Sequence, residues 1–289
     1  MTAPDLSREL FGHTFQNPIL LAAGTAGYGR ELDGVMDLDR LGGIVTKAVS
    51  LAPRAGNRAP RVAEFPGGML NSVGLANPGL AEVRARELPW LIGRLHRARI
   101  VVNIVGFTET EYAEVIAGLE DLEGIAGWEL NLSCPNTKAG GIEFGADPAS
   151  VARIVSGCRA ITRRGLIAKL SPVLPDIPAI AAAAVEAGAD GISVVNTIPG
   201  SLTRDGLPRL GNGSGGVSGP ALLPVGLLAV QRVKARLPDV PVIGVGGVRS
   251  AGDVRQYLGA GASLVAIGTA QLADPRVPQR IVEELMTHG

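Results

Sequence analysis

Cys134 stands among amide and hydroxyl side chains in the segment 131–136, Asn-Leu-Ser-Cys-Pro-Asn. The neighbouring side chains are mostly small or polar and have little to bury, which is typical of a functional loop. A thiol in such surroundings can ionise near neutral pH when lysine side chains or backbone N–H groups stabilise the thiolate. The segment contains no other acid–base group, so Cys134 is the best candidate for a proton acceptor or a nucleophile.

The second cysteine of the chain has a structural explanation. Cys158 falls in line with Val151, Ile154, Val155 and Ile161, and this spacing of three and four residues marks one buried stripe of a helix. We therefore expect Cys158 to be a core residue. The two cysteines cannot form a disulfide framework, and no Cys or His pair has the spacing of a zinc site, so a reduced, cytoplasmic environment is expected.

The distribution of apolar residues predicts an α/β barrel. Continuous apolar runs, typical of strands buried on both faces, alternate with segments of helical period. This repeated alternation predicts a (β/α)8 TIM barrel, with residues 1–289 as one domain. The expected strands are 19–23, 44–46, 100–104, 128–132, 166–170, 191–195, 242–245 and 264–267, and the expected helices are 33–41, 83–97, 109–122, 148–163, 177–187, 220–236, 251–258 and 277–286.

Two segments depart from the simple alternation. Residues 6–16 are expected to form a hairpin around Gly12, and residues 50–78 form an elaborated loop after strand two. In the segments 186–190 and 258–262, glycine ends an expected helix just before a strand. A left-handed turn at these glycines would stop each helix.

Amide and lysine side chains gather at the expected strand ends, where the chemistry of such barrels lies. Carboxamides both donate and accept hydrogen bonds, which suits a flat ring with alternating C=O and N–H groups, such as a pyrimidinedione or an isoalloxazine. No histidine or carboxylate pair stands at a strand end, which argues against a glycosidase or a two-metal site. Glu129 lies deeper, and its simplest interpretation is an ion-paired barrel residue. The amides and lysines concerned are Asn71, Asn103, Asn131, Asn196, Lys47 and Lys169.

Glycines after the last two strands predict a phosphate site. Gly246-Gly247 and Gly268-Thr269 offer backbone N–H groups close to helix N-termini, although ordinary tight turns are the alternative. The residue order of the Gly-rich segment 211–216 matches the fingerprint of dinucleotide-binding sites. The segment follows no expected strand, however, and the acidic residue that such sites have about 20 positions later is missing. We interpret it as a flexible loop near the barrel mouth.

Charge and hydropathy exclude several classes of partner. Lys+Arg and Asp+Glu both number 27, so net charge gives no reason to expect binding to nucleic acid or to an anionic membrane. The first residues lack the pattern of a signal peptide, and no run is apolar enough to suggest a membrane span. A small, nearly neutral ligand is the better expectation.

These segments together resemble the class 1 dihydroorotate dehydrogenases, most closely the 1B branch that works with a separate electron-transfer subunit. The resemblance runs nearly end to end. Class 2 enzymes, which use quinone, resemble the chain less, since they have serine at the position of Cys134. The motifs that carry the resemblance are 131–136 with 140–141 and 144–145, 71–75 with 77–79, 195–197, 216–220, 243–247 and 267–269.

The resemblance implies a flavin site and a substrate site at the barrel mouth. Lys169 would stabilise negative charge on the reduced flavin, and Cys134 would be the base for a substrate proton. FMN would contact Ala23, Lys47, Ala48, Asn103, Asn131, Lys169, Val195, Gly219, Gly246, Gly247, Gly268 and Thr269. Dihydroorotate would be held by Lys47, Asn71, Ser72, Val73, Gly74, Leu75, Asn131, Asn196 and Thr197.

The 1B resemblance also implies a pathway for electrons. Dihydroorotate would be oxidised to orotate in pyrimidine biosynthesis, and the electrons would pass to NAD through a partner subunit that carries FAD and a 2Fe–2S cluster. The expected assembly is a homodimer of this chain with two copies of that subunit, a heterotetramer. The 1A branch shares most of these motifs, so they specify the reaction more closely than the acceptor.

Three other functions remain open from the residues alone. A dihydropyrimidine dehydrogenase-like flavin barrel would act on a ring without the carboxylate. A phosphosugar isomerase barrel would use the same phosphate site without flavin, although the acid–base carboxylates for it are missing. A scaffold that binds flavin or a partner would need no catalytic cysteine.

Overall fold

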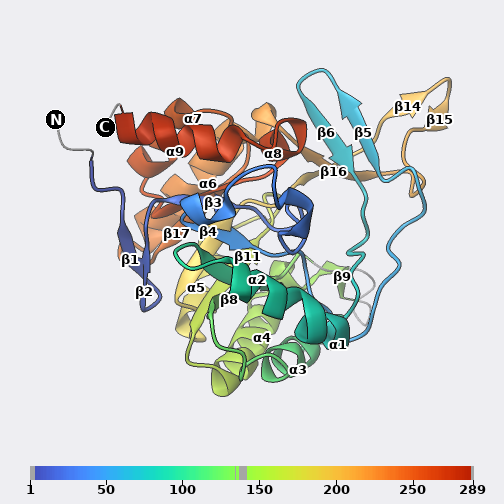
Figure 1. Ribbon diagram of the computed structural model, residues 1–289. Coiled ribbons are helices and arrows are strands. Elements are labelled where there is room, and N and C mark those ends of the chain that lie inside the picture. Colours follow the sequence, from blue (N-terminus) through green and yellow to red (C-terminus); the bar gives the residue numbers. More distant parts are fainter. Residues whose placement is uncertain (1–3, 134, 137–141, 288–289) are drawn as a thin grey trace.

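A closed barrel of parallel strands forms the centre of the protein (Figure 1). The structure, a computed structural model, describes residues 4–133, 135–136 and 142–287. Among these residues, eight parallel strands close in the order β3-β4-β7-β8-β11-β12-β17-β18, which confirms the predicted (β/α)8 barrel. They are β3 (Ile19–Leu21), β4 (Gly43–Val45), β7 (Arg99–Ile104), β8 (Ile125–Asn131), β11 (Gly165–Leu170), β12 (Gly191–Val194), β17 (Val242–Val245) and β18 (Leu264–Ile267).

The barrel strands are buried on both faces. Helices cover the outside, and alternate side chains fill the interior, so the strands need apolar residues at successive positions. The interior apolar cluster is separate from the larger core between strands and helices. Its buried members are Phe15, Leu20, Ala22, Val45, Val101, Ile167, Ile243, Val245, Leu264 and Ala266.

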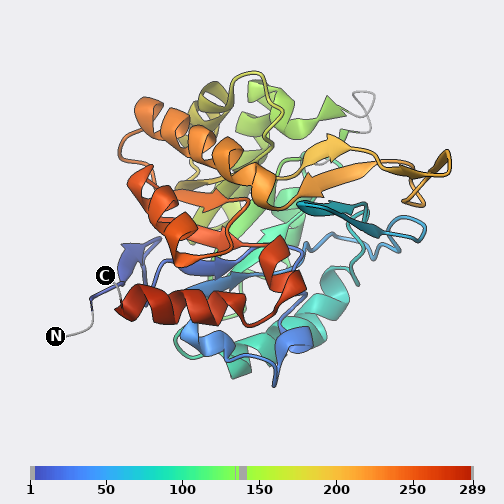
Figure 2. The ribbon, with the colours of Figure 1, turned by 90° about the horizontal axis from the view of Figure 1, so that it is seen from above.

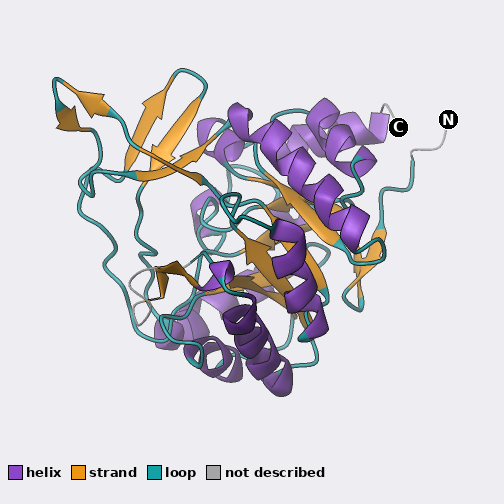
Figure 3. Ribbon diagram, turned by 180° about the vertical axis from the view of Figure 1, so that it is seen from behind, coloured by secondary structure: helices purple, strands orange, loops and turns teal. Residues whose placement is uncertain are grey.

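Helices surround the barrel on its outer side (Figure 3). The α-helices are α1 (Leu80–Glu82), α2 (Leu88–Arg94), α3 (Glu111–Ala117), α4 (Pro148–Ile161), α5 (Ile177–Glu186), α6 (Leu223–Arg236), α7 (Ala251–Gly259), α8 (Thr269–Ala273) and α9 (Val277–Thr287). A π-helical segment, η3 (Val83–Glu87), joins α1 to α2, and 3-10 turns are η1 (Arg30–Leu32), η2 (Leu38–Arg40), η5 (Phe144–Ala146) and η6 (Pro220–Leu222). In the described ranges no helix is both long and apolar enough to cross a membrane.

Side-chain caps fix where two of these helices begin. Asp147 accepts hydrogen bonds from the backbone N–H groups of Ala149 and Ser150, at 3.2 and 3.0 Å, at the start of α4. Ser250 and Asp253 form a reciprocal capping box at the start of α7. Both arrangements satisfy N–H groups that have no partner within the helix.

Glycine ends two helices, as predicted. Gly188 follows α5 with a φ of 110°, and Gly261 follows α7 with a φ of 101°. Glycine adopts this left-handed conformation without the steric cost of a side chain, so each helix stops and the chain turns into β12 or β18.

The prediction of a helix over residues 33–41 is wrong. The short turn η2 lies within this region, and η1 ends just before it, at Leu32. Gly34 has a φ of 77°, and the Asp37 carboxylate accepts a hydrogen bond from the Asp39 backbone N–H at 3.0 Å. A left-handed glycine and a competing side-chain acceptor interrupt the helical hydrogen-bond series.

The helix expected over residues 83–97 ends early, at Arg94. The backbone N–H groups of residues 96–98 donate to Asp39 Oδ1, at 2.9, 2.7 and 2.9 Å. This long-range acceptor replaces the helical carbonyls, so residues 95–97 of the expected range lie beyond the helix.

The predicted N-terminal hairpin closes the barrel at the amino-terminal ends of the strands. Strand β1 (Arg8–Leu10) pairs antiparallel with β2 (His13–Phe15). A Cβ added to Gly165 or Gly191, the first residues of β11 and β12, would lie 2.7 or 2.9 Å from Phe11. Phe15 is fully buried and meets the Phe11 ring edge-on, with the ring centres 6.3 Å apart. The hairpin is therefore a plug for the barrel interior.

A second, antiparallel sheet grows from the loops after β4 and β12. Its strand order is β13-β16-β6-β5, and with the hairpin β14-β15 it projects from the side of the molecule opposite β1, β2 and α9 (Figures 1 and 2). A further short hairpin pairs β9 (Pro135–Asn136) with β10 (Ile142–Glu143). The sheet strands are β5 (Val62–Phe65), β6 (Gly68–Asn71), β13 (Ile198–Gly200) and β16 (Gly215–Ser218), and the projecting hairpin is β14 (Thr203–Arg204) with β15 (Leu207–Pro208).

The interpretation of residues 211–216 as a flexible loop is wrong for its last two residues. Gly215 and Gly216 begin β16, which pairs with both β13 and β6. A Cβ on Gly215 would lie 2.1 Å from the Asn71 carbonyl oxygen, and one on Gly216 would lie 2.0 Å from Thr197 Oγ1. The glycines are needed for close strand approach rather than for flexibility.

We expect Phe15→Ala to lower the free energy of unfolding by about 3–5 kcal/mol, because it removes a fully buried ring from the closed end of the barrel. Denaturant unfolding of the purified chain measures this change. Thr14→Ala, at an exposed position of the same strand, is the control and should change the stability by no more than about 0.5 kcal/mol. Equal stability of the Phe15→Ala and wild-type chains would contradict the role of the hairpin as a plug.

Candidate active site

The carboxyl ends of the barrel strands bring most of the predicted site residues to one mouth. Asn131 is the last residue of β8, and its register partner on β11 is Lys169. Asn103, next to the last residue of β7, is the register partner of Glu129 on β8. Side chains paired in parallel register point to the same face of the sheet. These four side chains therefore lie in the barrel interior, near the carboxyl ends of the strands.

Glu129 connects two of the predicted residues. Its Oε1 accepts a hydrogen bond from Asn103 Nδ2 at 2.7 Å and lies 3.5 Å from Lys169 Nζ. Glu129 and Asn103 are each 1% exposed, and Lys169 is 6% exposed. The expectation that Glu129 is an ion-paired barrel residue is confirmed, and its partner is a residue predicted for the site.

Two buried polar atoms of the barrel interior have no hydrogen-bond partner among the described residues. They are Asn103 Oδ1 and Ser193 Oγ. Ser193 is the register partner of Lys169 on β12. A buried polar group without a partner costs about 1–3 kcal/mol. These atoms therefore fit a ligand or a water that supplies the missing hydrogen bonds.

A chain of hydrogen bonds links the ends of β8 and β12. Asn131 Oδ1 accepts from the Ser133 backbone N–H at 3.3 Å, and Ser133 Oγ accepts from Asn196 Nδ2 at 3.0 Å. The Thr197 backbone N–H donates to Asn196 Oδ1 at 2.8 Å. Asn131 and Asn196 are thus connected through Ser133. Cys134, the predicted base, follows Ser133 directly and lies outside the described residues.

Asn71 belongs to the second sheet, which places it beside Thr197. It pairs with Gly216 of β16, and its Nδ2 donates to the Gly216 carbonyl oxygen at 3.2 Å. The Thr197 side chain occupies the space where Gly216 would carry a Cβ. Asn71 and Thr197 are therefore neighbours across this glycine, although they are far apart in the sequence.

The predicted substrate residues 72–75 are ordered by contacts within their own loop. Asn57 Nδ2 donates to Ser72 Oγ at 2.7 Å, and the Asn57 backbone N–H donates to the Val73 carbonyl oxygen at 3.1 Å. Gly74 has a φ of 72°, and a Cβ there would lie 2.6 Å from Asn57. Leu75 also has a positive φ, 58°. No barrel strand supplies these contacts, so this part of the site depends on the loop's internal structure.

The glycines after β17 leave the backbone accessible beside α6. Gly246 and Gly247 have φ values of 118° and 76°, and a Cβ on Gly247 would lie 2.4 Å from the backbone nitrogen of Leu223. No side chain could occupy this position without displacing the start of α6. A bare backbone next to a helix start fits an anion such as a phosphate.

The residues after β18 lie beside the second sheet. Gly268 precedes α8, and the atoms nearest to its Cβ position are 3.7 Å away. Thr269 Oγ1 donates to Ser218 Oγ at 2.7 Å, which ties this strand end to β16. Gly219 follows with a φ of 123°, and a Cβ there would lie 2.7 Å from Gly68 Cα. Thr269, one of the predicted phosphate residues, therefore adjoins the sheet that carries Asn71.

The remaining predicted cofactor residues also follow barrel strands. Ala23 lies just after β3, Lys47 and Ala48 lie just after β4, and Val195 lies just after β12. The Val195 backbone N–H donates to the Val245 carbonyl oxygen at 3.0 Å, which joins the ends of β12 and β17. All four positions are on the same side of the barrel as the amides.

The three tyrosines of the chain hold the backbone at three strand ends. Burial raises the pKa of Tyr28 and of Tyr257 above the usual value, so both hydroxyls remain protonated donors. Each hydroxyl donates to a carbonyl oxygen of a predicted site residue. The pairs are Tyr28 with Ala48 (3.1 Å), Tyr112 with Asn131 (2.9 Å) and Tyr257 with Gly246 (2.8 Å).

Cys158 is a core residue, as predicted. It is fully buried in α4, and burial raises the pKa of its thiol to about 12. Ile161, expected on the same buried stripe, is 43% exposed because α4 ends there. A thiol with this pKa is neutral near pH 7 and is no candidate for a base.

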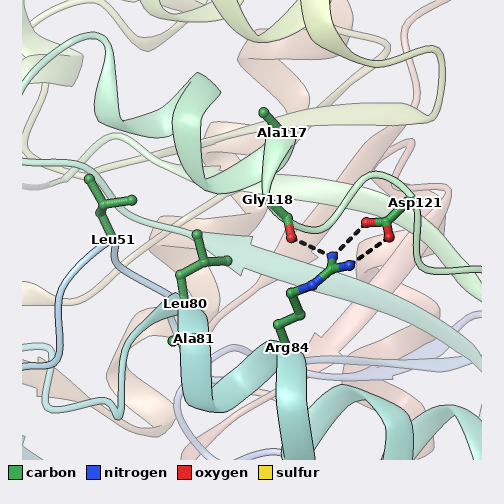
Figure 4. A pocket seen from close by; sticks show the side chains of 7 residues that line it. All are labelled: Leu51, Leu80, Ala81, Arg84, Ala117, Gly118 and Asp121. Carbon is green, nitrogen blue, oxygen red and sulfur yellow. Dashed lines mark hydrogen bonds and ion pairs between the residues drawn. The ribbon is translucent and has the colours of Figure 1, made fainter.

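Two surface cavities are lined by residues that were not predicted for the site. In one, of about 450 Å³, Arg84 binds both carboxylate oxygens of Asp121 and the Gly118 carbonyl oxygen, so its charge is already paired (Figure 4). The other, of about 900 Å³, is lined by residues 33–39, 94–96, 276 and 279–280. Within the described ranges, no group of three or more His, Cys, Asp or Glu side chains could hold a metal ion.

Several residues that order the site were not predicted. Ser133, Asn57 and Ser218 bond to the site residues Asn196, Ser72 and Thr269, which lie 63, 15 and 51 positions away in the sequence, so no local pattern marks them. The tyrosines are a weak sequence signal for such ordering contacts, because a buried tyrosine hydroxyl usually has a hydrogen-bond partner.

Comparison with known proteins identifies the family. Residues 5–288 match the dihydroorotate dehydrogenase family. Two relatives have the name dihydroorotate dehydrogenase B (NAD(+)), catalytic subunit. The relative from Pelobacter propionicus is 45% identical, and the alignment covers 97% of this chain and 92% of the relative. The relative from Geotalea uraniireducens is 44% identical, and the alignment covers 100% of this chain and 94% of the relative. A Solibacter usitatus relative, 45% identical over 98% and 92%, has the provisional name dihydroorotate dehydrogenase A (fumarate). The chain belongs to the dihydroorotate dehydrogenase family of flavoprotein oxidoreductases.

Proposed function

We propose that the chain is the catalytic subunit of an enzyme that oxidises dihydroorotate to orotate with FMN in pyrimidine biosynthesis. The observation that carries the proposal is the gathering of amides and a lysine at one barrel mouth in a chain of this family. Amides can match the alternating C=O and N–H groups of the pyrimidine ring. The names of the Pelobacter and Geotalea relatives support the same reaction.

The residues at the mouth fit FMN. The bare backbone after β17 and β18 suits its phosphate, and the unpartnered Asn103 Oδ1 suits a donor on a bound ring. When bound, FMN would accept at N5 the hydride that leaves C6 of the substrate. The residues proposed to hold it are Ala23, Lys47, Ala48, Asn103, Asn131, Lys169, Val195, Gly219, Gly246, Gly247, Gly268 and Thr269.

Lys47 and the amides are proposed to orient dihydroorotate. The Lys47 ammonium would pair with the substrate carboxylate, the group that distinguishes dihydroorotate from dihydrouracil. Residues 71–75, Asn131, Asn196 and Thr197 would fix the ring by hydrogen bonds, so that its C5–C6 bond is held in one orientation. The support is the contact of Asn71 with Gly216 and of Asn196 with Ser133.

Cys134 is the proposed base. Its thiolate would take the proton from C5, and loss of this proton and of the C6 hydride leaves the C5–C6 double bond of orotate. The support is its sequence position directly after Ser133, which is tied to Asn131 and Asn196. The other cysteine, Cys158, is a neutral core residue.

The electrons are proposed to reach NAD through a partner subunit that contains FAD and a 2Fe–2S cluster. The words "NAD(+)" and "catalytic subunit" in the names of the Pelobacter and Geotalea relatives support this route over fumarate. The proposed assembly is a homodimer of this chain with two such subunits.

Anaerobic addition of dihydroorotate to the purified chain should bleach the FMN absorbance, because the hydride reduces the bound flavin. An anaerobic visible spectrum measures this reduction. Dihydrouracil, which lacks the carboxylate, is the matched control and should reduce the flavin much more slowly. A colourless chain that binds no added FMN would contradict the proposed function, and faster reduction by dihydrouracil would indicate a different substrate.

Cys134→Ala should slow substrate-driven flavin reduction by about 10²–10⁴-fold, the usual contribution of a general base. Stopped-flow absorbance under anaerobic conditions gives the rate. Cys158→Ala is the cysteine control, and its surviving folded fraction should reduce FMN at the wild-type rate. An unchanged rate in Cys134→Ala would exclude Cys134 as the base.

Tyr257→Phe should weaken FMN binding by about fivefold, because it removes the hydroxyl that fixes the Gly246 carbonyl group, at a typical cost of about 1 kcal/mol. Riboflavin, which lacks the phosphate, is the control ligand, and its dissociation constant should not change. Fluorescence titration measures both. Equal weakening of FMN and riboflavin would show that Tyr257 does not act on the phosphate.

A further inference from the structure

Glu129 is a buried carboxylate to which the proposed reaction assigns no role. It lies in the barrel interior, 1% exposed, and a single oxygen, Oε1, contacts both Asn103 and Lys169. A buried charge needs partners, so a purely structural ion pair is the simplest explanation. Two details of the geometry go beyond that explanation.

The first detail is the orientation of the Asn103 amide. An ionised carboxylate only accepts hydrogen bonds, so the Nδ2 group of Asn103 must face Glu129. The amide oxygen then faces away from Glu129, and it is buried without a partner among the described residues. Glu129 thereby leaves Asn103 as an acceptor for a ligand N–H.

The second detail is the incomplete pairing of Lys169. Its Nζ lies 3.5 Å from Glu129 Oε1, a longer separation than an ordinary hydrogen bond, and an ammonium has three donors. Ser193, its register partner on β12, also has a buried hydroxyl oxygen without a partner. Glu129 thus holds the ammonium in place and leaves donors available to a ligand.

We propose that Glu129 is a positioning residue for the flavin: it anchors Lys169, turns the Asn103 amide, and sets how strongly the site prefers reduced over oxidised FMN. This inference rests on the proposed FMN site. Reduced flavin carries more negative charge than oxidised flavin. The carboxylate offsets part of the Lys169 charge, so it limits the stabilisation of the reduced form.

Glu129→Gln tests the effect of the charge, because it keeps the size of the side chain and one acceptor oxygen. We expect the ratio of the oxidised to the reduced FMN dissociation constant to rise about tenfold, as for a unit charge removed at short range in a buried site. Redox titration of the bound flavin against a reference dye gives this ratio. A merely structural residue would change stability without changing the ratio.

Glu120→Gln is the matched control. Glu120 is also a carboxylate in a long ion pair, 3.8 Å from Arg164, but that arginine precedes the first residue of β11 at the opposite end of the barrel. Its replacement should change the ratio by less than about twofold, since charge effects weaken with distance and solvent exposure. An equal shift in both variants, or an unchanged ratio in Glu129→Gln, would overturn the inference.

Glu129→Ala tests the orientation of Asn103, because it removes both acceptor oxygens. We expect it to weaken oxidised FMN about tenfold more than Glu129→Gln does, as for the loss of one oriented hydrogen bond. Equal affinities of the two variants for oxidised FMN would refute the orienting role, and if Glu129→Ala does not fold, the redox ratio of Glu129→Gln decides the inference. A wild-type chain that binds no FMN would instead refute the proposed function itself and this inference with it.

Discussion

Closure of the parallel barrel sets the arrangement of the candidate site. Each barrel strand is hydrogen-bonded to two neighbours, so the carboxyl ends of the strands face one side. Residues that are distant in the sequence, such as Asn103, Asn131 and Asn196, are thereby brought to one mouth. The helices bury the outer face of the strands, which leaves only the interior and the mouth for polar chemistry.

Apolar and polar side chains share the barrel interior. The hairpin residue Phe15 closes the amino-terminal end, and the apolar cluster extends to Val45 and Val245, the last residues of β4 and β17. Towards the mouth, Glu129 replaces apolar packing and binds Asn103 and Lys169. A buried carboxylate and ammonium cost desolvation energy, so their place directly below the mouth agrees with a role in binding a polar ring.

The second sheet and the tyrosine hydroxyls fix the segments that follow the barrel strands. Pairing of β6 with β16 places Asn71 beside Thr197, and Ser218 ties the same sheet to Thr269. The tyrosine hydroxyls hold backbone carbonyl groups at three strand ends. The candidate site therefore combines side chains from barrel strands with loop segments that are fixed by long-range contacts.

The order of the residues was enough to predict the strands, the N-terminal hairpin and the core position of Cys158, because burial on both faces requires apolar runs and helices require a regular spacing. It also determined which side chains follow each strand. Three contacts could be seen only in the folded protein: Asp39 ends a helix, Gly216 lies between Asn71 and Thr197, and Glu129 binds Lys169. These contacts join segments far apart in the chain, and barrel closure and sheet pairing set them rather than any local pattern.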